Sequence, residues 1–205
     1  MMMFCATKAR RAAALMVVLA MTLLSVQAAE VANAAATSGS GGRTVAQTKA
    51  GQMTSRIVGT TANGRDVTGS FVPLRFIKRN GKVFVRGLVQ GVVHETNGDR
   101  TKFATLKTVR VKSINGTPAK AGRDVAARAT CDILNLVLAP LDLDLLGLKV
   151  HLDRVVLNIV AQSGAGNLLG NLLCAVTGLL DGGLGGALGR LVNLLNQILG
   201  ALHLG

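Results

Sequence analysis

The chain lacks tryptophan and tyrosine, and it has only two glutamates among its 205 residues. Without Trp or Tyr, it has no indole or phenol platform for stacking sugars or bases. A glycosidase would need its carboxylate pair from aspartates, and there is no Gly-x-Ser-x-Gly elbow of a serine hydrolase. The chain also lacks the Cys-x-x-Cys spacing of zinc sites. We therefore expect no catalytic residue, no metal and no cofactor, and we predict that the protein is not an enzyme.

The N-terminus predicts export. Three basic residues, Lys8, Arg10 and Arg11, precede an uncharged apolar stretch at 12–26. The stretch ends in Val-Gln-Ala at 26–28, which fits the small-x-small rule for signal peptidase. Residues 1–28 are thus a predicted signal peptide, and the mature chain is expected in the cell envelope or outside the cell.

Two alternatives bear on this N-terminus. A second cleavage site lies within residues 31–36. The apolar stretch could instead be a membrane anchor, but its 15 residues fall short of the about 20 that a span needs. Cys5 precedes the apolar stretch, so it does not fit a lipidated cysteine.

Charge is distributed unevenly along the chain. Residues 43–128 carry 17 basic and 4 acidic side chains, whereas residues 131–205 carry 3 basic and 5 acidic ones. Such asymmetry favours attraction to anionic partners through the first half, such as envelope polymers, lipid head groups or nucleic acid. The alternative is a solvated surface that only keeps the protein soluble. The candidate polyanion contacts are Arg75, Lys78, Arg79, Lys82, Arg86, Lys107, Arg110 and Lys112.

Two cysteines remain after the predicted cleavage, Cys131 and Cys174. An even pair in an oxidising compartment predicts a disulfide. Two buried free thiols are the alternative.

Residues 29–69 are small and polar, and they include the Gly- and Ser-rich tract 38–42. We expect a flexible, low-complexity lead here, with at most a short strand near residues 56–58. The folded domain is then expected at 70–205.

Turn signals separate β-rich runs in the next part of the chain. Asn80-Gly81 lies between runs at 71–77 and 82–89, and this dipeptide is the strongest short hairpin signal. A slip in the alternation within 105–114 predicts a bulge or a different register, and the extra residue at 145–147 predicts a bulge or bend. Residues 131–162 alternate apolar and polar side chains, which is typical of antiparallel strands covering a core on one face.

From residue 167 the period becomes helical, and Asn167 is a suitable N-cap. After a break at 181–183, leucines and one isoleucine at 184, 188, 191, 195, 198 and 202 form a heptad stripe that needs a partner, either the sheet or a second chain. We predict an α+β fold: an antiparallel β-sheet or small sandwich at 71–162, covered by one or two C-terminal helices at 167–204.

The sequence CDILNLVLAPLDLDLLGL at 131–148, followed by GNLLGNLLCAV at 166–176, resembles an uncharacterised family of exported bacterial proteins. The resemblance covers residues 131–182 closely and 71–93 loosely. It implies that both cysteines belong to the core motif, and it brings no established activity, although a transporter substrate-binding label occurs among similar proteins.

These observations favour a non-enzymatic exported protein that binds anionic surfaces through a basic face. The second hypothesis is a carrier of a small apolar ligand held between sheet and helices. A hydrolase with an unrecognised site is the third.

Overall fold

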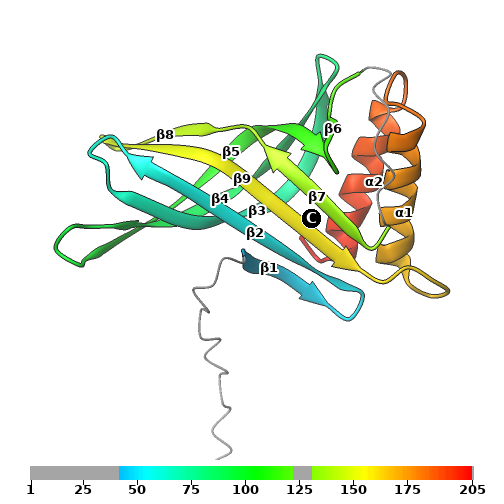
Figure 1. The fold of residues 1–205 in the computed structure, drawn as a ribbon, viewed down its shortest axis with the longest axis horizontal. Coiled ribbons are helices and arrows are strands. Elements are labelled where there is room, and N and C mark those ends of the chain that lie inside the picture. Colours follow the sequence, from blue (N-terminus) through cyan, green and yellow to red (C-terminus); the bar gives the residue numbers. More distant parts are fainter. Residues whose placement is uncertain (1–41, 122–130, 205) are drawn as a thin grey trace, which may run out of the picture. The chain divides into compact units, whose positions relative to one another are not determined.

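The computed structural model describes residues 42–121 and 131–204 (Figure 1). The predicted signal peptide and its cleavage site lie outside the described residues. The elements, in chain order, are β1 (Arg43–Thr48), β2 (Gly51–Thr61), β3 (Asp66–Arg79), β4 (Lys82–His94), β5 (Arg100–Ile114), β6 (Thr117–Pro118), β7 (Ile133–Leu138), β8 (Leu141–Leu145), β9 (Leu148–Ala161), α1 (Leu168–Asp181) and α2 (Leu188–Ala201).

The predicted α+β class is confirmed, and the antiparallel sheet is closed rather than layered. Six strands follow one another in the order β2-β3-β4-β5-β7-β9, and β9 pairs again with β2 to complete a barrel. This closing pair runs from Gly51 opposite Ala161 to Thr61 opposite Val150. The small sandwich that we considered is therefore replaced by a six-stranded antiparallel barrel, with β1 and β8 as added strands.

The expectation of a flexible lead at 29–69 is wrong for residues 43–69, which form β1, β2 and the start of β3. The small residues of β2 gave this segment the composition of a flexible linker. In the structure their small size lets the neighbouring strands approach closely. The Ser55 hydroxyl accepts a hydrogen bond from the Phe71 N–H at 2.8 Å. A Cβ at Gly59 would lie 2.2 Å from the His151 carbonyl oxygen. These small side chains are thus part of the barrel wall.

The hairpin predicted at Asn80-Gly81 is confirmed. Arg79 pairs with Lys82, and the two turn residues have φ of 50° and 66°. Positive φ at both positions is what a type I′ turn requires, and Asn and Gly tolerate it best.

The bulge or bend predicted at 145–147 is a tight hairpin turn between β8 and β9. Leu145 pairs with Leu148, and Leu146 and Gly147 both have positive φ. The Asp144 carboxylate accepts a hydrogen bond from the Gly147 N–H at 2.9 Å, which stabilises the turn. Leucine is rare at positive φ, so the sequence carried no recognised turn signal here.

The irregularity expected within 105–114 lies near the end of β5. β5 pairs with β4 without interruption from Arg100 to Arg110, and the irregularity lies between Val111 and Ser113, against β7. Leu106 broke the expected alternation because it is an exposed leucine on the outer face.

Two helices follow the barrel, as predicted, with the break at 181–183 between them. Asn167 occupies the N-cap position of α1, although its side chain makes no capping hydrogen bond. The heptad stripe is almost fully buried in the chain's own core, and α2 has no exposed large hydrophobic residue. The stripe therefore finds a partner within the chain, and self-association through this helix stays a prediction. No helix in the described part has the length and apolarity that spanning a membrane requires.

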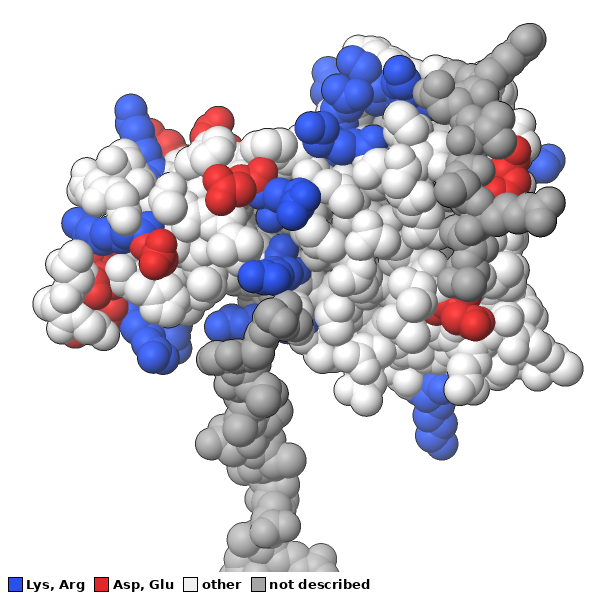
Figure 2. Space-filling model, in the orientation of Figure 1, with Lys and Arg blue, Asp and Glu red and all other residues white. Residues whose placement is uncertain are grey.

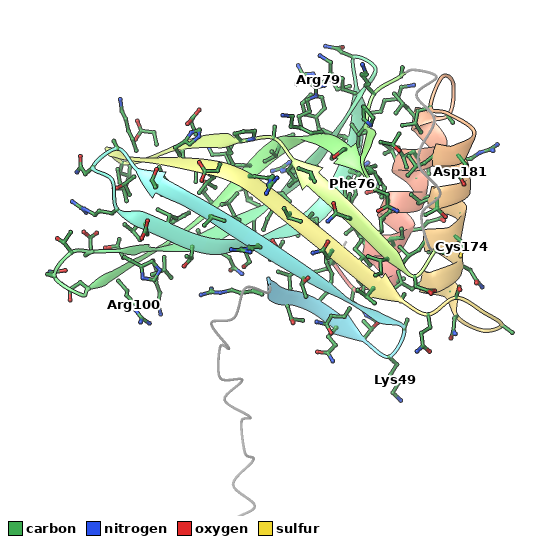
Figure 3. The ribbon with its side chains drawn as sticks, in the orientation of Figure 1. Lys49, Phe76, Arg79, Arg100, Cys174 and Asp181 are labelled. Atoms are coloured by element: carbon green, nitrogen blue, oxygen red, sulfur yellow. The ribbon has the colours of Figure 1, made fainter. Side chains whose placement is uncertain are left out.

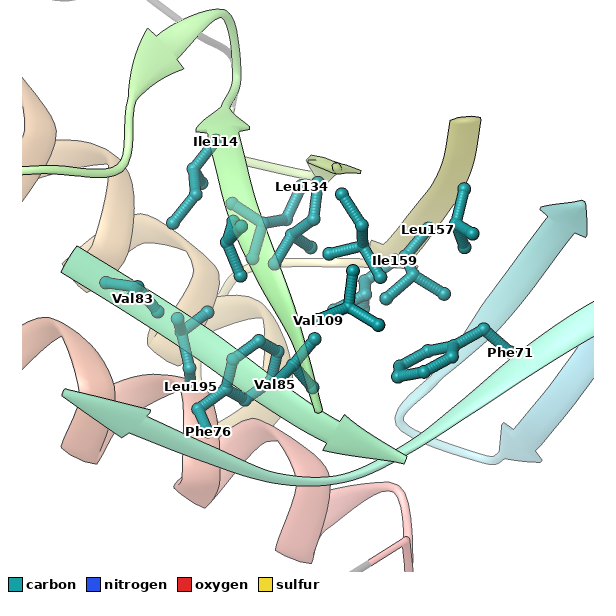
Figure 4. Packing of buried hydrophobic residues seen from close by; sticks show 14 of the residues in the cluster. Phe71, Phe76, Val83, Val85, Val109, Ile114, Leu134, Leu157, Ile159 and Leu195 are labelled. Carbon is teal, nitrogen blue, oxygen red and sulfur yellow. The ribbon is translucent and has the colours of Figure 1, made fainter. Parts of the chain in front are cut away.

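One aliphatic core joins the barrel and the helices (Figure 4). Phe71 and Phe76 of β3 and Leu157 of β9 are its large members, and Leu195 of α2 reaches the same cluster. Asn196, next to Leu195, fixes α2 to β3: its amide oxygen accepts from the Phe76 N–H at 2.7 Å, and its amide nitrogen donates to the Phe76 carbonyl at 3.0 Å. A polar residue beside the apolar stripe thus forms hydrogen bonds with the backbone of β3 next to its bulge.

Candidate functional site

The clearest concentration of charge lies on the outer face of the β3–β4 hairpin. Arg75 stands directly opposite Arg86, and Arg79 directly opposite Lys82. Residues opposite each other in an antiparallel pair project to the same side, with Cβ atoms about 5 Å apart. All four side chains are exposed. We call these four residues the hairpin patch.

Two predicted contacts on β5 extend this surface. Arg110 pairs with Phe84, which lies between Lys82 and Arg86 on the same outer face of β4. Lys112, two residues further along β5, alternates back to that face and is exposed. The hairpin patch with Arg110 and Lys112 is the basic face of this protein.

The basic face has no acidic counterpart in the described part of the chain. None of its six residues forms an ion pair with a carboxylate there, whereas Arg65 pairs with Glu95 elsewhere on the barrel. Figure 2 shows Lys and Arg side chains gathered over the end of the β3–β4 hairpin, from which Arg79 projects in Figure 3. Like charges directly opposite each other destabilise a sheet. A bound anion would relieve the repulsion between these basic side chains.

Two of the eight predicted contacts lie elsewhere. Lys78 is opposite the buried Val83, so it leaves β3 on the other side from Arg79. Lys107 is opposite Gly87 and shares its strand face with the buried Val109, which directs it to the inner face of the barrel. Successive side chains point to opposite faces of a strand, so these two lysines point to the other side of the sheet from the remaining six contacts.

The sequence interpretation missed Lys120. Lys120, which is not among the predicted contacts, forms an isolated bridge with Lys82 of the hairpin patch. The Asn115-Gly116 turn brings it there by reversing the chain after β5. The Asn-Gly dipeptide is a turn signal, but the sequence does not show that the turn brings Lys120 next to Lys82.

Comparison with known proteins assigns no role to these residues. No family model, curated protein or solved structure matches the chain. The resemblance at residues 131–182 therefore stays a resemblance, and every functional argument depends on the chain's own geometry.

The two predicted disulfide partners lie together as free thiols. Cys131, just before β7, hydrogen-bonds Cys174 of α1, and both side chains are half-buried. This hydrogen bond, followed by burial, raises the pKa of the Cys174 thiol, although Ser163 opposes the shift. A raised pKa keeps the thiol protonated, which disfavours a nucleophilic role. The position suits a covalent link between barrel and helix, and the disulfide stays a prediction.

A histidine between two carboxylates marks the outer face of β8 and β9. His151 Nδ1 lies 2.6 Å from an Asp142 carboxylate oxygen, and its Nε2 lies 3.8 Å from Asp153. The hydrogen bond to Asp142 raises the pKa of His151, aided by the charges of both aspartates and opposed by desolvation. Within residues 42–121 and 131–204, no group of three or more potential ligands is placed to hold a metal ion.

Two pockets lie on the barrel rather than under the helices. The first, of about 660 Å³, is at the far ends of β2, β8 and β9, with Thr61, Leu143 and Val150 among its lining residues. The second, of about 490 Å³, lies around the β1–β2 turn and the end of β9. Neither is lined by a residue of α1 or α2, whose inner faces pack into the core.

Proposed function

We propose that this is an exported, non-enzymatic protein that binds anionic polymers of the cell envelope or extracellular space through its basic face. The observation that carries the proposal is the pair of like-charged cross-strand contacts in the hairpin patch, Arg75 with Arg86 and Arg79 with Lys82. Selection for solubility alone does not require like charges to face each other on one hairpin. A polymer with repeated negative charges would neutralise both pairs at once.

Binding of this kind follows from counterion release. A polyanion carries condensed cations, and each lysine or arginine that replaces one contributes entropy, so affinity falls steeply as salt rises. The hairpin patch lies on paired strands, which hold its backbone in place before binding and lower the ordering cost. The expected behaviour is salt-sensitive, sequence-independent binding with no chemical turnover.

The test is retention of the secreted protein on immobilised heparin across a salt series. The variant R75S/R79S/K82S/R86S removes the hairpin patch and should elute at clearly lower salt than the wild type. Its matched control, R43S/K49S/K149S/R190S, removes the same charge from exposed positions elsewhere.

The control should elute close to the wild type, because its four positions lie outside the basic face. Equal losses of retention in both variants would mean that only net charge matters. Elution of the wild type below about 0.15 M salt, where screening already acts over about 8 Å, would also contradict the proposal.

The second function, a carrier for a small apolar ligand between sheet and helices, is less favoured by the packing of that region. Leu169, Leu173 and Leu195, among others, fill that region and are fully buried. The pocket of about 660 Å³ lies instead at the ends of β2, β8 and β9, where Asp142, Asp144, Lys149 and His151 line it together with Leu143 and Val150.

A further inference from the structure

The barrel wall has a seam between β5 and β8, along which these two strands are not paired in the described part of the chain. β7 and β8 both pair with the same side of β9, so they continue one another along it. β5 joins this line at Val111, opposite Leu138, and the Ala139 N–H still donates to the Arg110 carbonyl at 2.8 Å. Beyond that bond, in the described part of the chain, β5 pairs only with β4 and β8 only with β9. Two unpaired strand edges therefore lie on the two sides of this seam.

The lining of the seam is apolar and only partly covered. Leu141, Leu143 and Leu145 of β8 project inward with Leu152, Val150 and Leu148 of β9, their partners across the strand pair. Leu143 and Val150 are 2% exposed, whereas Leu141, Leu145 and Leu148 are half-buried. On the other side of the seam, Phe103 of β5 covers Gly91 and is also half-buried. An acyl chain would complete the burial of these side chains.

Lys107 is the exception in this lining. Among the inner-facing positions of β4, β5, β8 and β9, it alone carries a charge, and it is half-buried. Continuing the register of Val111 with Leu138 places Lys107 level with the segment 141–143 across the seam. No ion pair among the described residues includes it. An ammonium group on this apolar face, without a carboxylate partner among residues 42–121 and 131–204, favours an anionic group on a ligand.

We propose that the seam between β5 and β8 admits a single-chain amphiphile with an anionic head, whose chain lies along the leucines and whose head pairs with Lys107. The pocket of about 660 Å³ at this end of the barrel is separate from Lys107, because its lining comes from β2, β8, β9 and Ala62, includes Asp142 and Asp144, and has no residue of β5. Leu143 and Val150, which face the seam, also line this pocket. The site is separate from the basic face, because Lys107 points inward and the hairpin patch points outward.

The test is isothermal titration of the secreted protein with dodecanoate below its micelle concentration. The wild type should bind it saturably and more tightly than dodecyl maltoside, which has the same chain and an uncharged head. A parallel titration with lauroyl lysophosphatidylglycerol distinguishes a free carboxylate from a phosphate head as the preferred source of the charge.

The variant K107M keeps a long side chain and removes the charge, and it should weaken dodecanoate binding about tenfold, the effect of losing one charge-assisted contact. The matched control is K102M, on the same strand, because Lys102 is exposed and opposite Val92 on the outer face. K102M should bind like the wild type, and K107M should keep wild-type retention on heparin. Absence of saturable dodecanoate binding by the wild type, or equal affinity in K107M and K102M, would overturn the proposal without touching the proposed function.

Discussion

Replacing Asn196 by alanine tests how the helices are attached to the barrel. The change deletes both hydrogen bonds to the backbone of Phe76, a residue that is 1% exposed. Each bond contributes about 1 kcal/mol net, and leaving the buried N–H and C=O of Phe76 without partners adds about 1–3 kcal/mol for each group that water does not reach. Alanine regains up to about 0.7 kcal/mol of helix propensity. We expect N196A to lower the free energy of unfolding by about 2–4 kcal/mol.

The assay is urea denaturation monitored by circular dichroism, in which the midpoint should fall and the slope m should stay constant. Asn193 provides the control, because it is exposed on α2 and makes no side-chain hydrogen bond among the described residues. N193A should change stability by no more than about 0.5 kcal/mol. If N196A and N193A unfold at the same urea concentration, the pairing of Asn196 with Phe76 does not anchor the helix, and the reasoning fails.

Three further predictions concern processing, the thiols and pH. The intact mass of secreted material should correspond to a chain that begins at or near Ala29, and retention of the initiator methionine would contradict the predicted cleavage. Non-reducing peptide mapping should find Cys131 linked to Cys174; a closed loop of this length stabilises by about 4 kcal/mol in the chain-entropy model, so reduction should lower the unfolding midpoint. An NMR titration should give His151 a pKa above the ordinary histidine value, and D142N should lower it. Because the folded pKa is raised, the stability from this contact is fully present at pH below the unfolded pKa and is lost as pH rises through the folded pKa; an unchanged pKa in D142N would exclude Asp142 as its cause.

Much of the fold could be predicted because its signals are local. Asn80-Gly81 fixes a hairpin through the backbone conformation of two residues, and the change from alternating to helical periodicity after residue 162 separates sheet from helices. Barrel closure could not be predicted, because it depends on β2 pairing with β9 about a hundred residues away. The serines and glycines that permit this close pairing are the same residues that gave 43–69 the composition of a linker.

The sequence predicted which basic residues could belong to the candidate site, but it did not predict which of them lie on one face. Alternation along a strand is enough to separate Arg75 and Arg79 from Lys78. The position of Lys107 inside the barrel depends on its register with Gly87, which only the pairing of β5 with β4 reveals. Lys120 reaches Lys82 through a bridge that lies beyond any strand pattern.

The most direct test of the basic face is to map a bound polyanion onto the protein by NMR. In a titration of ¹⁵N-labelled secreted protein with a heparin oligosaccharide at low salt, we expect the largest amide shifts at Arg75, Arg79, Lys82 and Arg86, with Arg110 and Lys112 next. Shifts should be small at Lys49, Lys149 and Arg190, which are exposed basic residues outside the basic face. Shifts of similar size at all exposed basic residues would contradict a defined binding face and leave only non-specific charge attraction.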